Sequence, residues 1–134
     1  MALERYIKAQ ERDYAQALSE MRNGLKTSHW IWYIFPQIAG LGYSEMSRQY
    51  AIRDMDEAKS YLAHPVLGKR LIEISNALLT HNQSARSIMG SPDDLKLRSC
   101  MTLFSLVPGA DPVFEQVLHK FFDGKKDGAT LELV

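Results

Sequence analysis

Hydrophobic and polar residues alternate along this chain with the period of an α-helix. Apolar residues recur at i, i+3 and i+4 in the segment 3–21, which is followed by Gly24, a typical C-cap residue. Similar stripes cover 67–78 and 113–122. Strand-like alternation lasts no more than four residues except at 130–134. The pattern therefore predicts an all-α fold.

Capping residues predict where two of the helices begin. Asp54 and Glu57 have the spacing of a capping box, with acidic residues at the N-cap and at the third helical position. Ser91 is expected to cap a later helix, with Pro92 at the first helical position, where its missing N–H is not needed. Together with the stripes, these signals predict about six or seven helices in a single domain over residues 1–134.

The most unusual segment is 29–35, which holds four aromatic side chains in six residues. A short helix cannot direct all of them to one core, because its 3.6-residue period spreads them around the axis. Trp30 and Tyr33 share one face, whereas Trp32 and Phe35 share another. We expect a largely buried helix here; the alternative is that one aromatic face lines a groove for a planar ligand or a partner side chain.

Composition narrows the range of functions. The 16 basic and 16 acidic residues give zero net charge, which disfavours a protein that coats nucleic acid or an anionic membrane. A single cysteine, Cys100, excludes an intrachain disulfide, and the four histidines lack metal-ligand spacing, so we expect no metal and no cofactor. The N-terminus does not resemble a signal peptide, and the longest apolar run is far shorter than the ~20 residues of a membrane span. These features predict a cytoplasmic protein.

Sequence motifs for catalysis are absent. The Gly40–Gly42 pair lacks the third glycine of a dinucleotide-binding loop, because position 45 is glutamate. Asp123 and Asp127 fall at calcium-loop positions, but Val134 stands where the essential glutamate would be. Whether the protein is an enzyme is therefore left open.

Several strings along the chain resemble one known family. They are Ser-His-Trp-Ile-Trp-Tyr-Ile-Phe-Pro-Gln at 28–37, His-Pro-Val-Leu-Gly at 64–68, Ser-Pro-Asp-Asp-Leu-Lys-Leu-Arg-Ser at 91–99 and Met-Thr-Leu-Phe at 101–104. The chain resembles the family called domain of unknown function 1810 over nearly its whole length. This resemblance implies a small, single-domain, multihelical and mainly bacterial protein, and it implies no reaction. A more distant kinship, by analogy, connects it with helical proteins that act on ADP-ribose derivatives.

The resemblance singles out polar residues, and on these we place a candidate site. His29 and His64 are the candidate catalytic residues, because histidine titrates near neutral pH. The candidate ligand-binding residues, which supply rings, hydrogen bonds or charge, are Lys26, Trp30, Tyr33, Gln37, Arg70, Asp94 and Lys96. If these residues meet in one pocket, it would bind or process a small anionic, nucleotide- or ADP-ribose-like metabolite.

Structural alternatives stand beside each of these roles. A histidine is commonly a helix cap or a hydrogen-bonded structural residue, and Asp94 with Arg98 forms an i, i+4 pair that stabilises a helix. The second function hypothesis is an interaction module without enzymatic activity, whose aromatic groove binds a partner helix or loop. Because the chain has no heptad register, we expect a monomer or a weak dimer.

Overall fold

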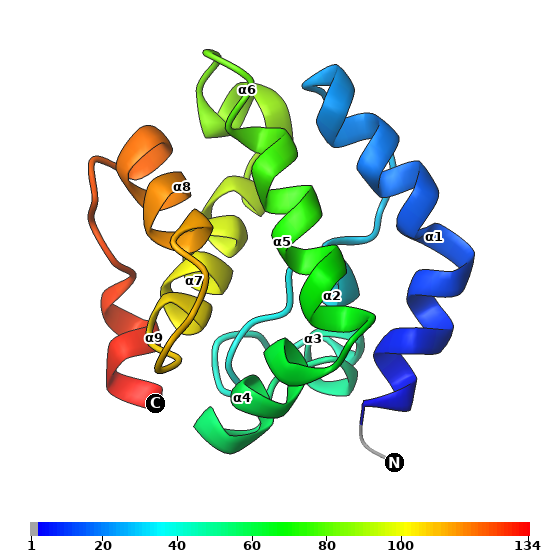
Figure 1. Cartoon of the computed structure of the whole chain (residues 1–134), viewed down its shortest axis with the longest axis vertical. Helices are drawn as coiled ribbons and strands as arrows, with labels where there is room; N and C mark the ends of the chain where they lie inside the picture. The colour runs from blue at the N-terminus through cyan, green and yellow to red at the C-terminus, as the bar shows by residue number, and fades with distance from the viewer. Residues whose placement is uncertain (1–2) are drawn as a thin grey trace.

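The computed structural model describes residues 3–134, and this part of the chain forms nine α-helices (Figure 1). They are α1 (Glu4–Asn23), α2 (Ile31–Ile34), α3 (Glu45–Gln49), α4 (Met55–Ala63), α5 (Leu67–Leu78), α6 (Ala85–Met89), α7 (Asp93–Ser105), α8 (Val113–Phe122) and α9 (Gly128–Leu133). Strand-type pairing within this range is confined to one isolated parallel bridge between Ile38 and Ile52. The all-α prediction is confirmed, although the expected number of helices was too low.

Three of the short helices begin at a polar capping residue. Ser44 and Ser84 cap α3 and α6, each five residues long, and Asp127 caps the six-residue α9. The Asp127 carboxylate accepts hydrogen bonds from the backbone N–H and the hydroxyl of Thr130. These bonds stabilise a helical turn, so the strand-like alternation at 130–134 does not produce a strand.

Most of the long helices begin and end as their local sequence predicts. Asp54 accepts a hydrogen bond from the Glu57 N–H at 2.9 Å, and Gly24 ends α1 in the left-handed conformation, with φ of 77°. The prediction for α7 was wrong by one position. Pro92 is the N-cap, and its carbonyl accepts from the N–H groups of the first helical turn, so Ser91 makes no capping bond.

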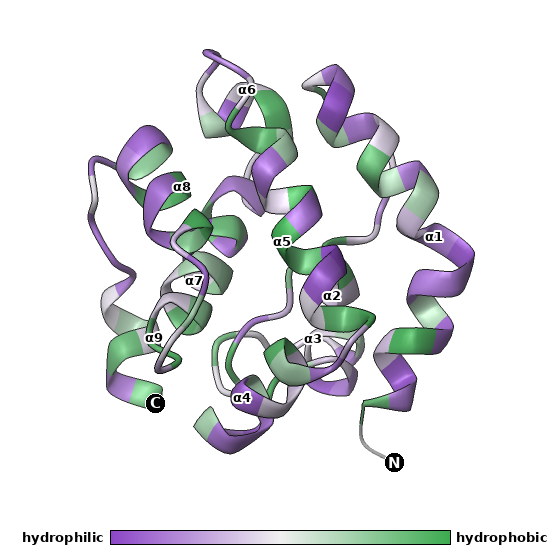
Figure 2. Cartoon of the chain, in the orientation of Figure 1, coloured by the Kyte–Doolittle hydropathy of each residue, from purple (hydrophilic) through white to green (hydrophobic). Residues whose placement is uncertain are grey.

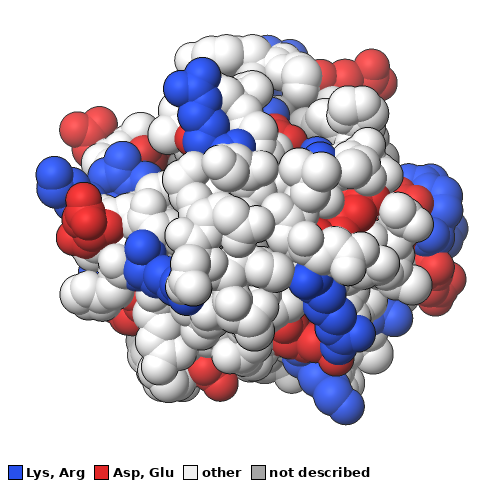
Figure 3. All heavy atoms as spheres, turned by 90° about the horizontal axis from the view of Figure 1, so that it is seen from above, with Lys and Arg blue, Asp and Glu red and all other residues white. Residues whose placement is uncertain are grey.

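Helix α5 lies between α1 on one side and α7 and α8 on the other (Figure 1), and the hydrophobic core is formed where they meet. Hydropathy changes repeatedly along α1 and α8, as expected for helices with one buried face (Figure 2). On the face shown in Figure 3, acidic and basic side chains are interspersed. Among the residues described, no helix combines the length and the apolar character needed to cross a bilayer.

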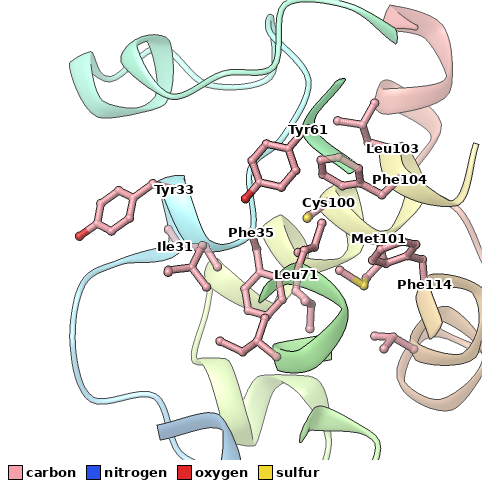
Figure 4. Close-up of a cluster of buried hydrophobic side chains, with 14 of the residues drawn as sticks. Ile31, Tyr33, Phe35, Tyr61, Leu71, Cys100, Met101, Leu103, Phe104 and Phe114 are labelled. Atoms are coloured by element: carbon pink, nitrogen blue, oxygen red, sulfur yellow. The ribbon is translucent and has the colours of Figure 1, made fainter. Parts of the chain in front are cut away.

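The aromatic segment lies in the middle of this core, as predicted. Trp30, Tyr33 and Phe35 are almost completely buried, and Figure 4 shows Phe35 near Tyr61 in the central cluster, with the Tyr33 hydroxyl directed away from it. Trp32 is the exception, because its indole remains partly exposed. The expectation of a largely buried segment is therefore confirmed, and Trp32 is the ring of this segment that lines a pocket.

Candidate functional site

A pocket of about 340 Å³ lies beside the exposed indole of Trp32. Its wall is formed by the segment after α2, the loop before α3, the first turns of α7 and the start of α9. The bridge to Ile52 holds this wall, since the Ile52 N–H donates to the Gln37 carbonyl at 2.8 Å. The aromatic and polar side chains that line the pocket are Trp32, Gln37, Ser47, Arg48, Tyr50, Lys96, Ser99 and Asp127.

Lys96 brings a positive charge to the pocket. Its Nζ lies 5.8 Å from the centre of the Trp32 ring and 3.8 Å from Asp93 Oδ1. Asp93 makes a closer ion pair with Lys26, at 2.9 Å through Oδ2, and the Lys26 side chain is only 6% exposed. Because Lys26 and Asp93 neutralise each other, the charge of Lys96 remains largely uncompensated. Lys26 itself packs over the Trp30 ring and does not line the pocket.

Arg48 and Asp127 complete the charged groups of the pocket wall. Arg48 is exposed on α3 and makes no hydrogen bond or ion pair within residues 3–134. Asp127 Oδ2 accepts three hydrogen bonds, two from Thr130 and one from the Ser99 hydroxyl at 3.2 Å. The pocket thus presents two cationic side chains and one carboxylate, none of them paired with another.

Trp30 is held by a buried carboxylate that the sequence analysis did not single out. Glu20 is 4% exposed and accepts from the Trp30 indole N–H at 2.9 Å, and also from Ser28, Thr27 and Gln16. Burial alone would raise the pKa of Glu20, but these hydrogen bonds outweigh it and lower the pKa to about 2. A signal was present in the sequence, because Glu20 lies on the apolar stripe of α1.

The two candidate catalytic histidines lie outside the pocket. The ring of His64 caps α5, with Nδ1 accepting from the N–H groups of Val66 at 3.1 Å and Leu67 at 3.3 Å. His29 is exposed, and its carbonyl accepts from the Tyr33 hydroxyl at 3.5 Å. His64 therefore has the capping role that we considered as the structural alternative for a histidine.

Tyr33 and Arg70 brace α1 against its neighbours. The Gln10 side chain on α1 donates to the Tyr33 carbonyl at 2.8 Å and accepts from Arg70 at 3.4 Å. The Tyr33 hydroxyl donates to Asp13, also on α1, and burial together with this carboxylate raises the pKa of the phenol. Both residues thus contribute to the docking of α1 and lie away from the pocket wall.

Asp94 does not form the expected pair with Arg98. Arg98 instead donates to the carbonyls of Lys125 at 2.8 Å and Lys126 at 2.9 Å, because the segment before α9 packs against α7. Asp94 Oδ1 is buried without a hydrogen-bond partner. Of the nine predicted site residues, Gln37 and Lys96 line the pocket, and the other seven lie outside its wall.

Comparison with known proteins identifies the family. A family described as "Protein of unknown function (DUF1810)" matches residues 1–134, the whole chain. The chain belongs to the DUF1810 family. No match is found among the curated proteins.

A solved structure shares the DUF1810 fold closely. It is the crystal structure of the conserved hypothetical protein Rv1873 from Mycobacterium tuberculosis, which is 40% identical to this chain. The match covers 98% of this chain and 95% of that chain, with a TM-score of 0.96. The architecture described above is therefore shared with an experimentally determined structure.

The chemistry available in this DUF1810 pocket follows from its lining. Trp32 offers a flat apolar surface, Lys96 and Arg48 offer positive charge, and the other polar groups offer hydrogen bonds. Cys100 lies elsewhere, fully buried in α7, and burial raises the pKa of its thiol, which makes it unreactive. The arrangement is suited to hold a small molecule that has a ring and a negative charge.

Proposed function

We propose that this protein binds a small, ring-bearing anionic metabolite in the Trp32 pocket. The observation that carries this proposal is the position of Lys96, whose ammonium lies 5.8 Å from the Trp32 ring on the wall of one cavity. A ligand ring would pack on the indole while its anionic group pairs with Lys96 and Arg48. The Gln37 side chain would then bind polar groups on the ligand.

The size of the pocket limits the ligand. Its volume of about 340 Å³ is near the lower end of the range of small-molecule sites, roughly 300–1,000 Å³. This volume favours one ring system with one anionic group, as in a nucleoside monophosphate. An ADP-ribose derivative, with two sugars and two phosphates, would extend beyond the pocket.

A thermal-shift screen tests the proposal directly. The probes are nucleoside monophosphates, aromatic carboxylates and ADP-ribose, added to the full chain at neutral pH. A ligand present at 100 times its dissociation constant stabilises the folded protein by ~2.7 kcal/mol, which raises the melting temperature by several degrees. Tryptophan fluorescence provides a second readout, because the partly exposed indole of Trp32 lines the pocket while Trp30 is buried.

Matched variants locate the bound probe. We expect Lys96→Gln to weaken binding about tenfold or more, because a charge-assisted hydrogen bond is lost. Lys69→Gln is the control, since Lys69 is an exposed lysine of α5 that does not line the pocket. If no probe stabilises the protein, or if both variants bind a probe equally well, the proposal is wrong.

A second candidate function is the binding of a partner protein, which the surface around the pocket favours. Tyr43 is 81% exposed and follows Gly42 of the pocket wall, and Leu95, also on the wall, is 56% exposed. Exposed apolar residues beside a cavity are common at protein contacts. We expect light scattering to show a monomer or a weak dimer; a stable higher oligomer that Tyr43→Ser dissolves would favour this second function.

A further inference from the structure

Asp127 places a carboxylate in the pocket that we assign to an anion. Its Oδ2 is used by Ser99 and Thr130, which fix it at the start of α9. Its Oδ1 accepts no hydrogen bond from residues 3–134 and is not buried. Asp127 therefore lines the pocket with one of its two oxygens unpartnered among residues 3–134.

The surrounding structure holds this carboxylate apart from the pocket cations. The Asp127 N–H donates to the Thr102 hydroxyl at 2.9 Å, and Arg98 holds the two preceding carbonyls, so the segment is fixed on α7. Ser99, which donates to Asp127, is three residues after Lys96 and therefore lies one helical turn away. Lys96 is directed to Asp93 at 3.8 Å, and no ion pair joins it to Asp127.

We infer that the ligand carries an N–H donor as well as its anionic group, and that this donor binds Asp127 Oδ1. The inference rests on the proposed function, since it concerns the same pocket. A carboxylate facing an anion that has no donor would repel it, whereas an amino group on the ligand makes a charge-assisted hydrogen bond there. Asp127 then rejects ring-bearing anions without a donor, and Lys96 and Arg48 select for the negative charge.

Pairs of probes that differ only in the amino group test this inference. One pair is adenosine monophosphate and purine riboside monophosphate, and the other is 4-aminobenzoate and benzoate. We expect the amino-bearing member to bind the full chain about tenfold or more tightly, measured by calorimetry or by fluorescence of Trp32. Equal affinities within both pairs would overturn the inference and leave the proposed function standing, whereas no binding by any of the four would overturn both.

Substitution of Asp127 tests whether its carboxylate causes the preference for the amino-bearing probe. Asp127→Asn keeps an N-cap residue for α9, because asparagine caps helices as well as aspartate does. We expect this variant to bind both members of a pair with similar affinity, and to bind the member without the amino group at least as tightly as the wild type.

Asp123→Asn is the matched control on the same segment. Asp123 has a positive φ of 54°, which asparagine also adopts readily, and it does not line the pocket. Its ratio of affinities should match that of the wild type. Retention of the full ratio by Asp127→Asn would overturn the inference. Should Asp127→Asn fold poorly, the two wild-type pairs decide the matter without it.

Discussion

Glu20 and Asp127 are two carboxylates that accept hydrogen bonds from backbone N–H groups, Glu20 from the 27–28 segment and Asp127 from the first turn of α9. They differ in how many of their oxygens accept hydrogen bonds. Both oxygens of Glu20 accept hydrogen bonds, from donors that include the Trp30 indole and the N–H groups of Thr27 and Ser28. Asp127 uses Oδ2 alone. The first carboxylate is buried and both its oxygens are hydrogen-bonded, so it serves the fold. The second belongs to a residue that lines a pocket, and one of its oxygens has no partner among residues 3–134.

The largest effect is expected from Glu20→Ala. The change removes a buried acceptor and leaves several donors of the 27–30 segment without a partner, which should lower the free energy of unfolding by ~3–5 kcal/mol. Urea unfolding monitored by tryptophan fluorescence measures this. Glu11→Ala on the exposed side of α1 is the control and should change stability by less than ~0.5 kcal/mol. Similar stability of both variants would contradict the assignment of Glu20 to the fold.

The contribution of Glu20 to stability should depend on pH. The folded pKa of Glu20 is lowered to about 2 from an ordinary value of 4.5, so its contribution to stability is fully present above pH 4.5. This contribution, of about 3 kcal/mol, is lost as the pH falls through about 2. The difference in unfolding free energy between wild type and Glu20→Gln should therefore become smaller as the pH is lowered from 6 to 2. A difference independent of pH would contradict this prediction.

A smaller effect is expected at the ion pair behind the pocket. Asp93→Asn leaves the buried ammonium of Lys26 without its counter-ion and should cost about 2 kcal/mol of stability. Adding Lys26→Met to this variant should recover part of the loss, because the buried charge is then removed as well. Chemical denaturation of the two variants provides the measurement, and a double variant less stable than Asp93→Asn would show that Lys26 contributes mainly through other contacts.

The smallest effect on stability is expected for the pocket cations. Lys96→Gln and Arg48→Gln should each change the free energy of unfolding by less than ~0.5 kcal/mol, because their ion pairs are loose or absent within the described chain. Both should weaken the binding of an anionic probe. Thermal melts with and without the probe separate the two effects. A large loss of stability in the absence of a probe would show that Lys96 and Arg48 stabilise the fold, as Glu20 does.

The helices were predictable where their signals are local. Asp54 with Glu57, and Gly24, lie within a few residues of the backbone groups that they satisfy, so their roles can be recognised in the sequence. The start of α7 was misplaced by one residue because Pro92 occupies the N-cap position and its carbonyl accepts from the first helical turn. The alternation at 130–134 does not produce a strand, because Asp127 caps a helix there.

The candidate site was predictable only in part. Gln37 and Lys96 were identified through their motifs, but the partners that make a pocket of them come from distant segments. Arg48 belongs to a short helix and was not singled out, and Asp127 was considered as a calcium-loop position. Helix packing brings Asp127 to Ser99, 28 residues earlier, and no periodicity in the sequence encodes that contact. His64 was predicted as a site residue from its motif, but its ring accepts from the N–H groups at the start of α5.

The double use of Asp127 connects the pocket with the end of the chain. The same carboxylate caps α9 through Oδ2 and, in the complex that we propose, accepts from the ligand through Oδ1, so the two events share one group. Thermodynamic reciprocity then requires that a ligand bound at this oxygen and the folding of α9 influence each other by equal amounts. The amide protons of Gly128–Leu133 should accordingly exchange with solvent at a rate that reports the occupancy of the pocket.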